Sequence, residues 1–417
     1  MSYYVVQGGQ TLRGSVPISG AKNSVLPILA ATLLNGGRSV LHNCPDLRDV
    51  RSAIQILEHL GCKVSREGDT VTVDSTVVDR WDVPHELMRE MRSSVIFLGP
   101  ILARCGRARL SLPGGCDIGQ RPIDLHLTAL RKLGAVIREQ GGDILCEASD
   151  LQGRDIILSF PSVGATENTL LTATACSGVT RIINAAREPE IADLQEFLRK
   201  AGALVSGGGE SVITVSGTTP RRDVEHTILP DRIEAATFLC AAAACGGEVT
   251  LTGVEPEHVG TVIQCLRDGG CTVRSAGRTI TLLAPQRLGS MPTVRTMPYP
   301  GFPTDSQAPL MAAACTAQGS ALFIETIFEN RFRHAAELQR MGADIRISGR
   351  TALVTGKQLH GAQVRSTDLR GGAALVVAAL AAQGESRVEA LTHIDRGYEH
   401  FAEKLTGLVA KIQRRDD

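Results

Sequence analysis

A single cysteine in a glycine-rich segment is the first feature of this chain that could do chemistry. Cys116 lies within Leu-Pro-Gly-Gly-Cys-Asp-Ile-Gly-Gln-Arg-Pro, and Arg121 follows five positions later. Glycines let a backbone approach a ligand closely, and a neighbouring cation favours the thiolate. Asp117 opposes this effect, because an adjacent negative charge disfavours thiolate. The segment predicts an acid or a nucleophile; the alternative is a buried cysteine that packs as a small apolar side chain.

Three further segments place polar groups at predicted helix starts, where N–H groups attract anions. Lys22 and Asn23 open the first helix in Gly-Ala-Lys-Asn-Ser. Arg92 precedes an apolar helix, and Ser-Val-Gly at residues 162–164 precedes another. These groups could hold phosphate. The alternatives are an exposed lysine, an ordinary first-turn arginine and a plain turn.

Asp305 follows the Pro- and Gly-rich segment Pro-Gly-Phe-Pro-Thr and precedes a helix of small residues. A carboxylate in this position could act as a general base. The alternative is an N-cap, since aspartate favours that position.

Arginines also begin helices or loops late in the chain, in Glu-Asn-Arg-Phe, Asp-Leu-Arg-Gly and His-Ile-Asp-Arg. They are enough, with the earlier cations, to form a strongly cationic site in a neutral protein. Such a site suits a ligand with several phosphates and carboxylates. The cations concerned are Lys22, Arg92, Arg121, Arg331, Arg370 and Arg396.

The elements that must position these residues repeat six times along the chain. One part of the repeat is an apolar helix that runs through glycine into a strand, at residues 31–41, 101–112, 173–183, 241–251, 312–324 and 378–388. We expect the glycine to be the C′ residue that ends each helix. The other part is an amphipathic helix followed by a hairpin, at residues 57–73, 130–146, 198–215, 266–282 and 338–354. A sixth copy, at residues 405–415, stops before its last strand.

Two groups of three repeats predict two similar α/β domains. We expect one strand, at residues 3–18, to close the last repeat. One domain would then be discontinuous and comprise residues 1–21 and 230–417, and the other would comprise residues 22–229. A repeat scaffold that only binds partners is the alternative.

The composition argues against several classes of function. Lys plus Arg and Asp plus Glu number 44 each, so no bulk attraction to nucleic acid or to an anionic membrane follows. The eleven cysteines show neither a CxxC pair nor zinc spacing, so no metal is expected. The N-terminus lacks the features of a signal peptide, and the purest apolar run, residues 373–382, is about half a membrane span. Free cysteines without a signal suit a cytoplasmic protein.

The motifs together resemble the UDP-N-acetylglucosamine enolpyruvyl transferase family (UDP-N-acetylglucosamine 1-carboxyvinyltransferases). The resemblance runs end to end and rests on residues 20–23, the Cys116 segment with residues 121–125, and residues 231–234, 302–305, 329–332 and 393–399. It implies an inside-out α/β barrel, the enolpyruvyl transferase fold, with two domains that close over a cleft. It also implies transfer of the enolpyruvyl group of phosphoenolpyruvate to the 3-hydroxyl of UDP-N-acetylglucosamine, the first committed step of peptidoglycan synthesis. No cofactor, nucleic acid, membrane or obligate protein partner is implied.

The resemblance assigns roles by matching position. The implied catalytic residues are Cys116, as proton donor and site of a phosphoenolpyruvate adduct, Asp305, which faces the sugar 3-hydroxyl, Lys22 and Arg396. The residues implied to bind phosphoenolpyruvate are Lys22, Asn23, Cys116, Arg121 and Arg396. Those implied to contact the UDP-sugar are Asn23, Arg92, Arg121, Pro122, Ile123, Asp124, Leu125, Ser162, Val163, Gly164, Asp305 and Ile327, with Asp231, Arg331 and Arg370 in support. Two alternatives are the same chemistry on 3-phosphoshikimate and a non-catalytic paralogue that binds UDP-sugar.

Overall fold

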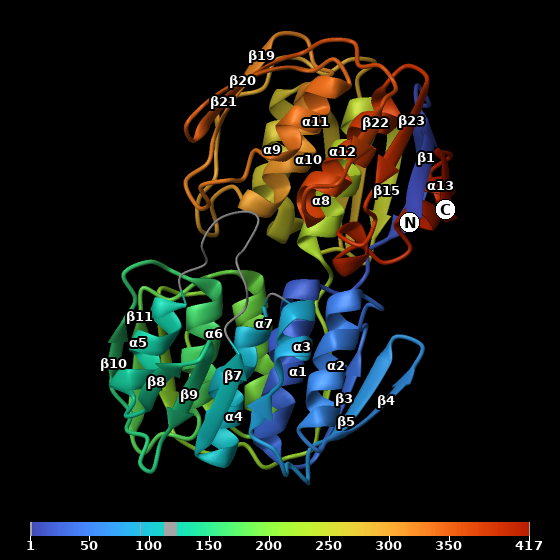
Figure 1. The fold of residues 1–417 in the computed structure, drawn as a ribbon. Coiled ribbons are helices and arrows are strands. Elements are labelled where there is room, and N and C mark those ends of the chain that lie inside the picture. The colour runs from blue at the N-terminus through green and yellow to red at the C-terminus, as the bar shows by residue number, and fades with distance from the viewer. Residues whose placement is uncertain (1, 92, 112–122, 417) are drawn as a thin grey trace. The chain divides into compact units, whose positions relative to one another are not determined.

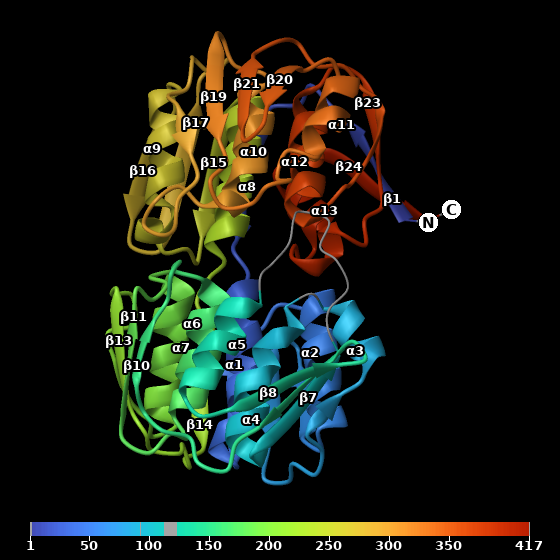
Figure 2. The same cartoon turned by 60° about the vertical axis from the view of Figure 1, so that its left-hand side comes forward.

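The computed structural model of the protein describes residues 2–91, 93–111 and 123–416. These residues divide into two compact units. The continuous unit comprises residues 20–91, 93–111 and 123–229, and the discontinuous unit comprises residues 2–19 and 230–416. Each unit has helices at its centre and sheets at its periphery (Figures 1 and 2).

Three helices form the centre of the continuous unit, where they contact one another. They are α1 (Lys22–Asn35), α4 (Leu98–Cys105) and α6 (Val163–Ala173). Their sequences are apolar on most sides, and α1 buries every residue except Asn23, as expected for a helix without a polar face. The other helices of this unit are α2 (Arg48–His59), α3 (His85–Glu90), η1 (Ser94–Phe97), α5 (Asp124–Lys132) and α7 (Pro189–Lys200).

Three four-stranded sheets accompany these helices, in the orders β14-β3-β5-β4, β6-β7-β9-β8 and β10-β11-β13-β12. In each sheet the first pair of strands is parallel and the other two pairs are antiparallel. The strands are β3 (Arg38–His42), β4 (Lys63–Glu67), β5 (Thr70–Asp74), β6 (Asp82–Val83), β7 (Arg107–Ser111), β8 (Val136–Gln140), β9 (Asp143–Glu147), β10 (Asp155–Ile157), β11 (Val179–Ile183), β12 (Leu204–Ser206), β13 (Val212–Ser216) and β14 (Val224–Thr227). Pairing of β14 with β3 joins the end of the unit to its beginning.

The discontinuous unit repeats this plan. Its central helices are α8 (Arg232–Cys245), α10 (Thr304–Ala314) and α12 (Leu369–Ala381), and each contacts the other two. The outer helices are η2 (Pro256–Val259), α9 (Gly260–Asp268), α11 (His334–Arg340), η3 (Ile394–Arg396) and α13 (Phe401–Gly407). The alanine-rich sequences of the central helices allow this close mutual packing, because small side chains let helix axes approach.

The sheets of the discontinuous unit have the orders β2-β15-β17-β16, β18-β19-β21-β20 and β22-β23-β1-β24. Their strands are β1 (Ser2–Gln7), β2 (Leu12–Pro17), β15 (Gly247–Thr252), β16 (Thr272–Ala276), β17 (Thr279–Ala284), β18 (Val294–Arg295), β19 (Ser320–Ile324), β20 (Asp344–Ser348), β21 (Thr351–Thr355), β22 (Gln363–Arg365), β23 (Glu385–Glu389) and β24 (Lys411–Asp416). Strand β1 lies between β23 and β24 and is antiparallel to both. It takes the place that the second hairpin strand takes in the other five sheets.

The N-terminal segment departs from the prediction of one strand at residues 3–18. It forms β1 and β2, which belong to two different sheets. The chain turns between them at Gly8 and Gly9. A Cβ on Gly8 would lie 2.1 Å from the carbonyl oxygen of Ala382, and Gly9 has a φ of +77°, so both positions require glycine.

The two-part repeat is confirmed, with helices inside and sheets outside, although the described residues form six separate sheets rather than one closed barrel. The expected C′ glycine is present after α1 and α4, where Gly36 and Gly106 are left-handed. The prediction is wrong for α6, α10 and α12. These helices end earlier, and Gly178, Gly319 and Gly384 stand in the turns that follow, each with a φ near +90°. Glycine is needed in these turns because residues with a Cβ rarely adopt such a positive φ.

Candidate active site

Four of the predicted site residues, Arg92, Cys116, Arg121 and Pro122, lie outside the described residues. The others are distributed over both units. The continuous unit carries Lys22, Asn23, Ile123, Asp124, Leu125, Ser162, Val163 and Gly164, and the discontinuous unit carries Asp231, Asp305, Ile327, Arg331, Arg370 and Arg396.

Lys22 is the first residue of α1, and its ammonium is paired with a buried carboxylate. Lys22 Nζ lies 2.8 Å from Oδ2 of Asp49, which is in the first turn of α2. Lys22 is 9% exposed and Asp49 is completely buried. The exposed-lysine alternative is therefore wrong, and the pair fixes the ammonium at the start of α1. The sequence gives no sign of Asp49, because only the packing of α1 against α2 brings it to Lys22.

A second network ties the first turn of α1 to its neighbours. The Ser24 hydroxyl donates a short hydrogen bond to Oδ2 of Asp193 in α7. Oδ1 of Asp193 lies 2.9 Å from Nε2 of His226 in β14, and the Leu229 N–H also donates to this carboxylate, at 3.3 Å. The position of Lys22 and Asn23 is thus set by α2, α7 and β14 together.

The predicted contacts at residues 123–125 and 162–164 lie at the starts of α5 and α6. Ser162 is the N-cap of α6, and its hydroxyl accepts from the Ala165 N–H at 3.4 Å; Val163 and Gly164 already belong to the helix. His126, in the first turn of α5, lies against the start of α6. A Cβ on Gly164 would be 2.9 Å from Cε1 of His126, so glycine allows the ring to approach.

His126 is held in a neutral form. Burial lowers its pKa to about 4. Asn168 Nδ2 lies 2.8 Å from Nδ1 of His126, and an amide NH₂ is a donor only, so the ring proton is on Nε2. The carbonyl oxygen of the same amide accepts from the Gly99 N–H at 2.8 Å. The contacts of His126 and Asn168 bring the start of α5 to α6.

On the discontinuous unit, Asp305 meets two arginines. Asp305 Oδ1 lies 2.6 Å from Nη2 of Arg331, and Oδ2 lies 3.7 Å from Nη2 of Arg370. The N-cap alternative for Asp305 is wrong, because the N-cap of α10 is Pro303 and Asp305 stands in the first turn. Arg331 also donates to the carbonyl of Thr304, at 3.3 and 3.4 Å. The unit thus brings together three residues that the sequence only suggested.

Arg370 is buried and permanently charged. Burial alone would lower its pKa, but Tyr398, Asp305 and Asp231 raise it above the usual arginine value. The guanidinium lies 5.3 Å from the centre of the Tyr398 ring, and the Tyr398 hydroxyl is 2.8 Å from that of Thr237. Tyr398 and Thr237 therefore help to fix the cation that faces Asp305.

Two of the remaining predicted residues, Asp231 and Ile327, make hydrogen bonds that stabilise the local structure. The Asp231 side chain caps α8 and accepts from the N–H groups of Ile233 and Glu234 at 2.8 and 2.9 Å. Ile327 follows β19, and its N–H donates to Oε1 of Glu325 at 2.9 Å. Arg396 is half-buried at the end of η3.

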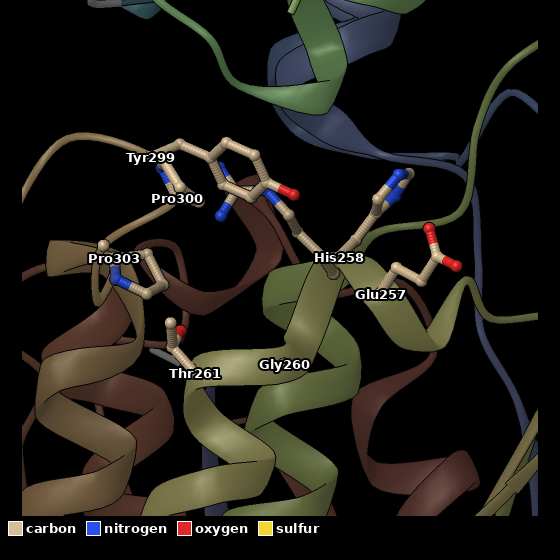
Figure 3. Close-up of a pocket in the computed structure, with 9 residues that line it drawn as sticks. Glu257, His258, Gly260, Thr261, Tyr299, Pro300 and Pro303 are labelled. Atoms are coloured by element: carbon tan, nitrogen blue, oxygen red, sulfur yellow. The ribbon is translucent and has the colours of Figure 1, made fainter.

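A cavity of ≈ 250 Å³ borders the starts of α8 and α10. Its walls are formed by Arg232, Glu257, His258, Gly260, Thr261, Tyr299, Pro300, Gly301 and Pro303. Figure 3 shows Tyr299 and the prolines on one side and Glu257 and His258 on the other. The Arg232 guanidinium lies 5.6 Å from the Tyr299 ring centre. Arg232 follows Asp231 and Pro303 precedes Thr304, so the cavity adjoins the predicted residues.

Across residues 2–91, 93–111 and 123–416, no three His, Cys, Asp or Glu side chains are grouped to hold a metal ion. No helix in that part of the chain is long and apolar enough to cross a bilayer.

Comparison with known sequences gives full-length matches. The family model for EPSP synthase (3-phosphoshikimate 1-carboxyvinyltransferase) matches residues 6–405. UDP-N-acetylglucosamine 1-carboxyvinyltransferase 1 of Symbiobacterium thermophilum is 53% identical over 99% of this chain and 95% of that protein. UDP-N-acetylglucosamine 1-carboxyvinyltransferase 2 of Caldanaerobacter subterraneus subsp. tengcongensis is 48% identical over 99% of this chain and 100% of that protein.

Solved structures confirm the predicted fold class. The enolpyruvyl transferase NikO from Streptomyces tendae matches with a TM-score of 0.90 and 26% identity, over 99% of this chain and 98% of that chain. EPSP synthase from Acinetobacter baumannii matches with a TM-score of 0.73 over the whole of both chains, and at 18% identity this likeness shows the fold alone.

Proposed function

Because the chain belongs to the enolpyruvyl transferase family, we propose that it transfers the enolpyruvyl group of phosphoenolpyruvate to the 3-hydroxyl of UDP-N-acetylglucosamine and releases phosphate. The observation that carries this proposal is the 53% identity to a UDP-N-acetylglucosamine 1-carboxyvinyltransferase over nearly the full length of both chains. The reaction would commit the UDP-sugar to peptidoglycan synthesis, in the cytoplasm, and so serve cell shape and division.

A second acceptor, 3-phosphoshikimate, is suggested by the description of the family model. The solved EPSP synthase shares only 18% identity with this chain, against 46–53% for the relatives named for UDP-N-acetylglucosamine. The UDP-sugar is therefore the acceptor that we propose. Incubation with phosphoenolpyruvate and each acceptor in turn, followed by mass measurement, tests the choice. Product from 3-phosphoshikimate alone would reverse it.

The reaction needs an acid, a base and enough positive charge to hold a carboxylate and a phosphate. Protonation of the methylene carbon of phosphoenolpyruvate makes C2 electrophilic. The sugar 3-oxygen then bonds to C2 and gives up its hydroxyl proton, which produces a tetrahedral ketal. The ketal loses a methyl proton and phosphate, and the double bond forms again. We assign the first proton transfer to Cys116, which also forms the covalent adduct with phosphoenolpyruvate.

We propose that Asp305 faces the sugar 3-hydroxyl as a base or an orienting carboxylate. Its geometry supports this role. Arg331 holds one oxygen of the carboxylate at 2.6 Å, while the Asp305 side chain stays 30% exposed and accessible to a ligand. Arg370 adds a second permanent charge close by. The pair of arginines would also stabilise negative charge on a bound substrate.

The anionic groups of phosphoenolpyruvate are assigned to Lys22, Arg121 and Arg396, together with Asn23. In support, Lys22 keeps 11% of its side chain exposed while Asp49 fixes its ammonium. An anchored cation loses little conformational freedom when an anion binds, which favours binding.

The UDP-sugar is assigned to Asn23, Arg92, residues 121–125, residues 162–164, Asp305 and Ile327. The starts of α5 and α6 support the assignment of the diphosphate. His126 lies against Gly164 and is hydrogen-bonded to Asn168, so the start of α5 lies close to the start of α6. Unpaired N–H groups at a helix start bind phosphate well. We propose residues 1–21 with 230–417, and residues 22–229, as the two domains that contribute these groups.

A further inference from the structure

We propose that Glu325 is a positioning residue that holds two substrate-contacting segments, at Asp305 and at Ile327, in a fixed relation to each other. The inference rests on the proposed function, because that function assigns both residues to the UDP-sugar. Nothing in the sequence pattern singles out Glu325. Its importance is evident only from its contacts.

The Glu325 carboxylate is a buried hub. It directly follows β19 and is 1% exposed. Oε1 accepts from the N–H groups of Ile327 and Phe328, at 2.9 and 3.1 Å, and from the hydroxyl of Thr296, at 2.9 Å. Oε2 accepts from the Thr304 hydroxyl at 3.0 Å. Four neutral donors thus converge on one carboxylate, which gives strong, charge-assisted hydrogen bonds.

The two backbone contacts of Oε1 shape the segment that contains Ile327. The chain after β19 folds back so that two successive N–H groups point at the side chain of Glu325. The Thr296 hydroxyl reinforces the turn, because it also accepts from the Thr326 N–H at 2.9 Å. The N–H groups of Ile327 and Phe328 therefore both depend on one acceptor oxygen of Glu325.

The contact of Oε2 with the Thr304 hydroxyl reaches the start of α10. Thr304 is the first residue of this helix and directly precedes Asp305. Glu325 holds its hydroxyl, while Arg331 holds its carbonyl at 3.3 and 3.4 Å and the Asp305 carboxylate at 2.6 Å. The first turn of α10 is thus fixed from two sides, by a carboxylate and by a guanidinium.

These contacts make one buried side chain responsible for the spacing between the sugar-facing carboxylate and the Ile327 segment. Removal of the acceptor would leave buried donors unsatisfied, and both segments would shift to find new partners. A displacement of about 1 Å can reduce catalysis by about a hundredfold. A residue with only a structural role would instead reduce the amount of folded enzyme and leave the KM of each substrate unchanged.

The test compares Glu325→Ala with Glu325→Gln in steady-state kinetics. Alanine removes all four interactions. Glutamine keeps one acceptor oxygen for the two N–H groups, and its NH₂ can donate to the Thr304 hydroxyl, so it should rescue most of the function. We expect Glu325→Ala to raise the KM for UDP-N-acetylglucosamine by about tenfold or more and Glu325→Gln by less than about threefold. The KM for phosphoenolpyruvate should change less than about twofold in both, since the spacing concerns the sugar.

Thr304→Val and Thr304→Ser provide a second pair in case Glu325→Ala does not fold. Valine lacks the hydroxyl that Glu325 holds, whereas serine keeps it. We expect Thr304→Val to lower kcat and raise the KM for the UDP-sugar, and Thr304→Ser to stay close to the unmodified enzyme. Glu337→Gln is the matched control, because Glu337 accepts from the Arg365 N–H at 2.9 Å in the same unit but has no contact with these segments among those described.

Calorimetric binding of UDP-N-acetylglucosamine separates this inference from the proposed function. Suppose that the unmodified enzyme forms product, and that Glu325→Ala and Thr304→Val both bind the UDP-sugar with normal affinity and show an unchanged KM for each substrate. This result overturns the inference and leaves the proposed function standing. If the unmodified enzyme forms no product from this sugar, the proposed function fails first. Equal losses in Glu325→Gln and Glu325→Ala would also contradict the role of the acceptor oxygen.

Discussion

The guanidinium of Arg331 donates a hydrogen bond to the carboxylate of Asp305 at 2.6 Å, and the two side chains differ in exposure, at 4% and 30%. The arginine is buried and also donates to the carbonyl of Thr304, while the Asp305 side chain is partly exposed. An ion pair of this kind holds the carboxylate in one orientation. Asp305 therefore contributes to stability in addition to the role that we propose for it in the reaction.

Replacement of Asp305 by asparagine should separate these two contributions. Asparagine keeps the shape and one acceptor but removes the charge. We expect kcat to fall roughly 10²–10⁴-fold, the range of a general base. The free energy of unfolding should fall by about 1–3 kcal/mol, because Arg331 loses a charged partner.

Steady-state kinetics and urea unfolding give the two values for Asp305→Asn. Asp344→Asn is a suitable control, because Asp344 pairs with Lys357 at 3.2 Å on an outer strand of the same unit. The control should change stability by less than about 1 kcal/mol and leave kcat unaltered. Full turnover in Asp305→Asn would assign the residue to structure alone and leave the reaction without an identified base.

The Lys22–Asp49 pair allows a test in which both charges are removed. Lys22→Met removes the ammonium that pairs with a completely buried carboxylate, so the free energy of unfolding should fall by about 3–5 kcal/mol. The double variant Lys22→Met with Asp49→Asn should recover most of this stability. It should not recover affinity for phosphoenolpyruvate, because the proposed ligand for the anion is still missing. Recovery of activity together with stability in the double variant would show that Lys22 acts only as the partner of Asp49.

Fosfomycin, an epoxide that mimics phosphoenolpyruvate, should alkylate Cys116. Burial raises the pKa of each of the ten described thiols, to about 12 for Cys44 and about 11 for Cys265, and so keeps them in the unreactive form. Intact-mass analysis should therefore show one adduct, mapped to the peptide that contains Cys116 and formed faster with UDP-N-acetylglucosamine present.

Two variants sharpen the fosfomycin experiment. Cys116→Asp should resist the drug and keep measurable turnover, since a carboxyl can also donate a proton. Cys105→Ser is the control among the described thiols that are only partly buried, and it should leave labelling intact. A label that disappears in Cys105→Ser and persists in Cys116→Asp would place the reactive thiol elsewhere.

His126 predicts a specific dependence of stability on pH. Its native pKa of about 4 lies below the usual histidine value of about 6.5, so the unfolded chain binds the proton more readily. The stability that the neutral ring contributes is fully present above about pH 6.5. It is lost as the pH falls towards 4, by up to about 3 kcal/mol.

The measurement is the difference in the free energy of unfolding between the unmodified protein and His126→Gln, from urea unfolding at several pH values. The difference is needed because other groups act in the opposite direction. Burial raises the pKa of Glu234 to about 7, so the contribution of Glu234 to the free energy of unfolding falls as the pH rises from about 4.5. Stability curves that stay parallel from pH 7 to about pH 4 would contradict a buried neutral His126.

Much of the fold could be predicted because each part of the repeat has its own local pattern of apolar and polar residues. Apolar helices such as α8 and hairpins such as that of β4 and β5 follow from periodicity in short windows. The two strands at residues 2–17 were missed because their separation depends on Gly8, which packs against the carbonyl of Ala382 at the other end of the chain. No local window contains that contact.

The site residues also divide into those that a local sequence pattern identifies and those that depend on long-range packing. Asp305, Arg331 and Arg370 could be identified as candidates from their neighbours in sequence, and the structure brings them together. Asp49 and Glu325 could not be identified, because each is an ordinary acidic residue until packing places it beside its partners. Residues that hold functional groups in place carry little local signal.

The most direct test of the proposed function is the amount of phosphate released when the purified enzyme is mixed with phosphoenolpyruvate and UDP-N-acetylglucosamine, measured together with the mass of the sugar product. We expect phosphate release only when both substrates are present. Each phosphate should be matched by one molecule with the mass of UDP-N-acetylglucosamine plus one enolpyruvyl group. Phosphate release without this product, or no release from an enzyme that binds both substrates, would contradict the proposed function.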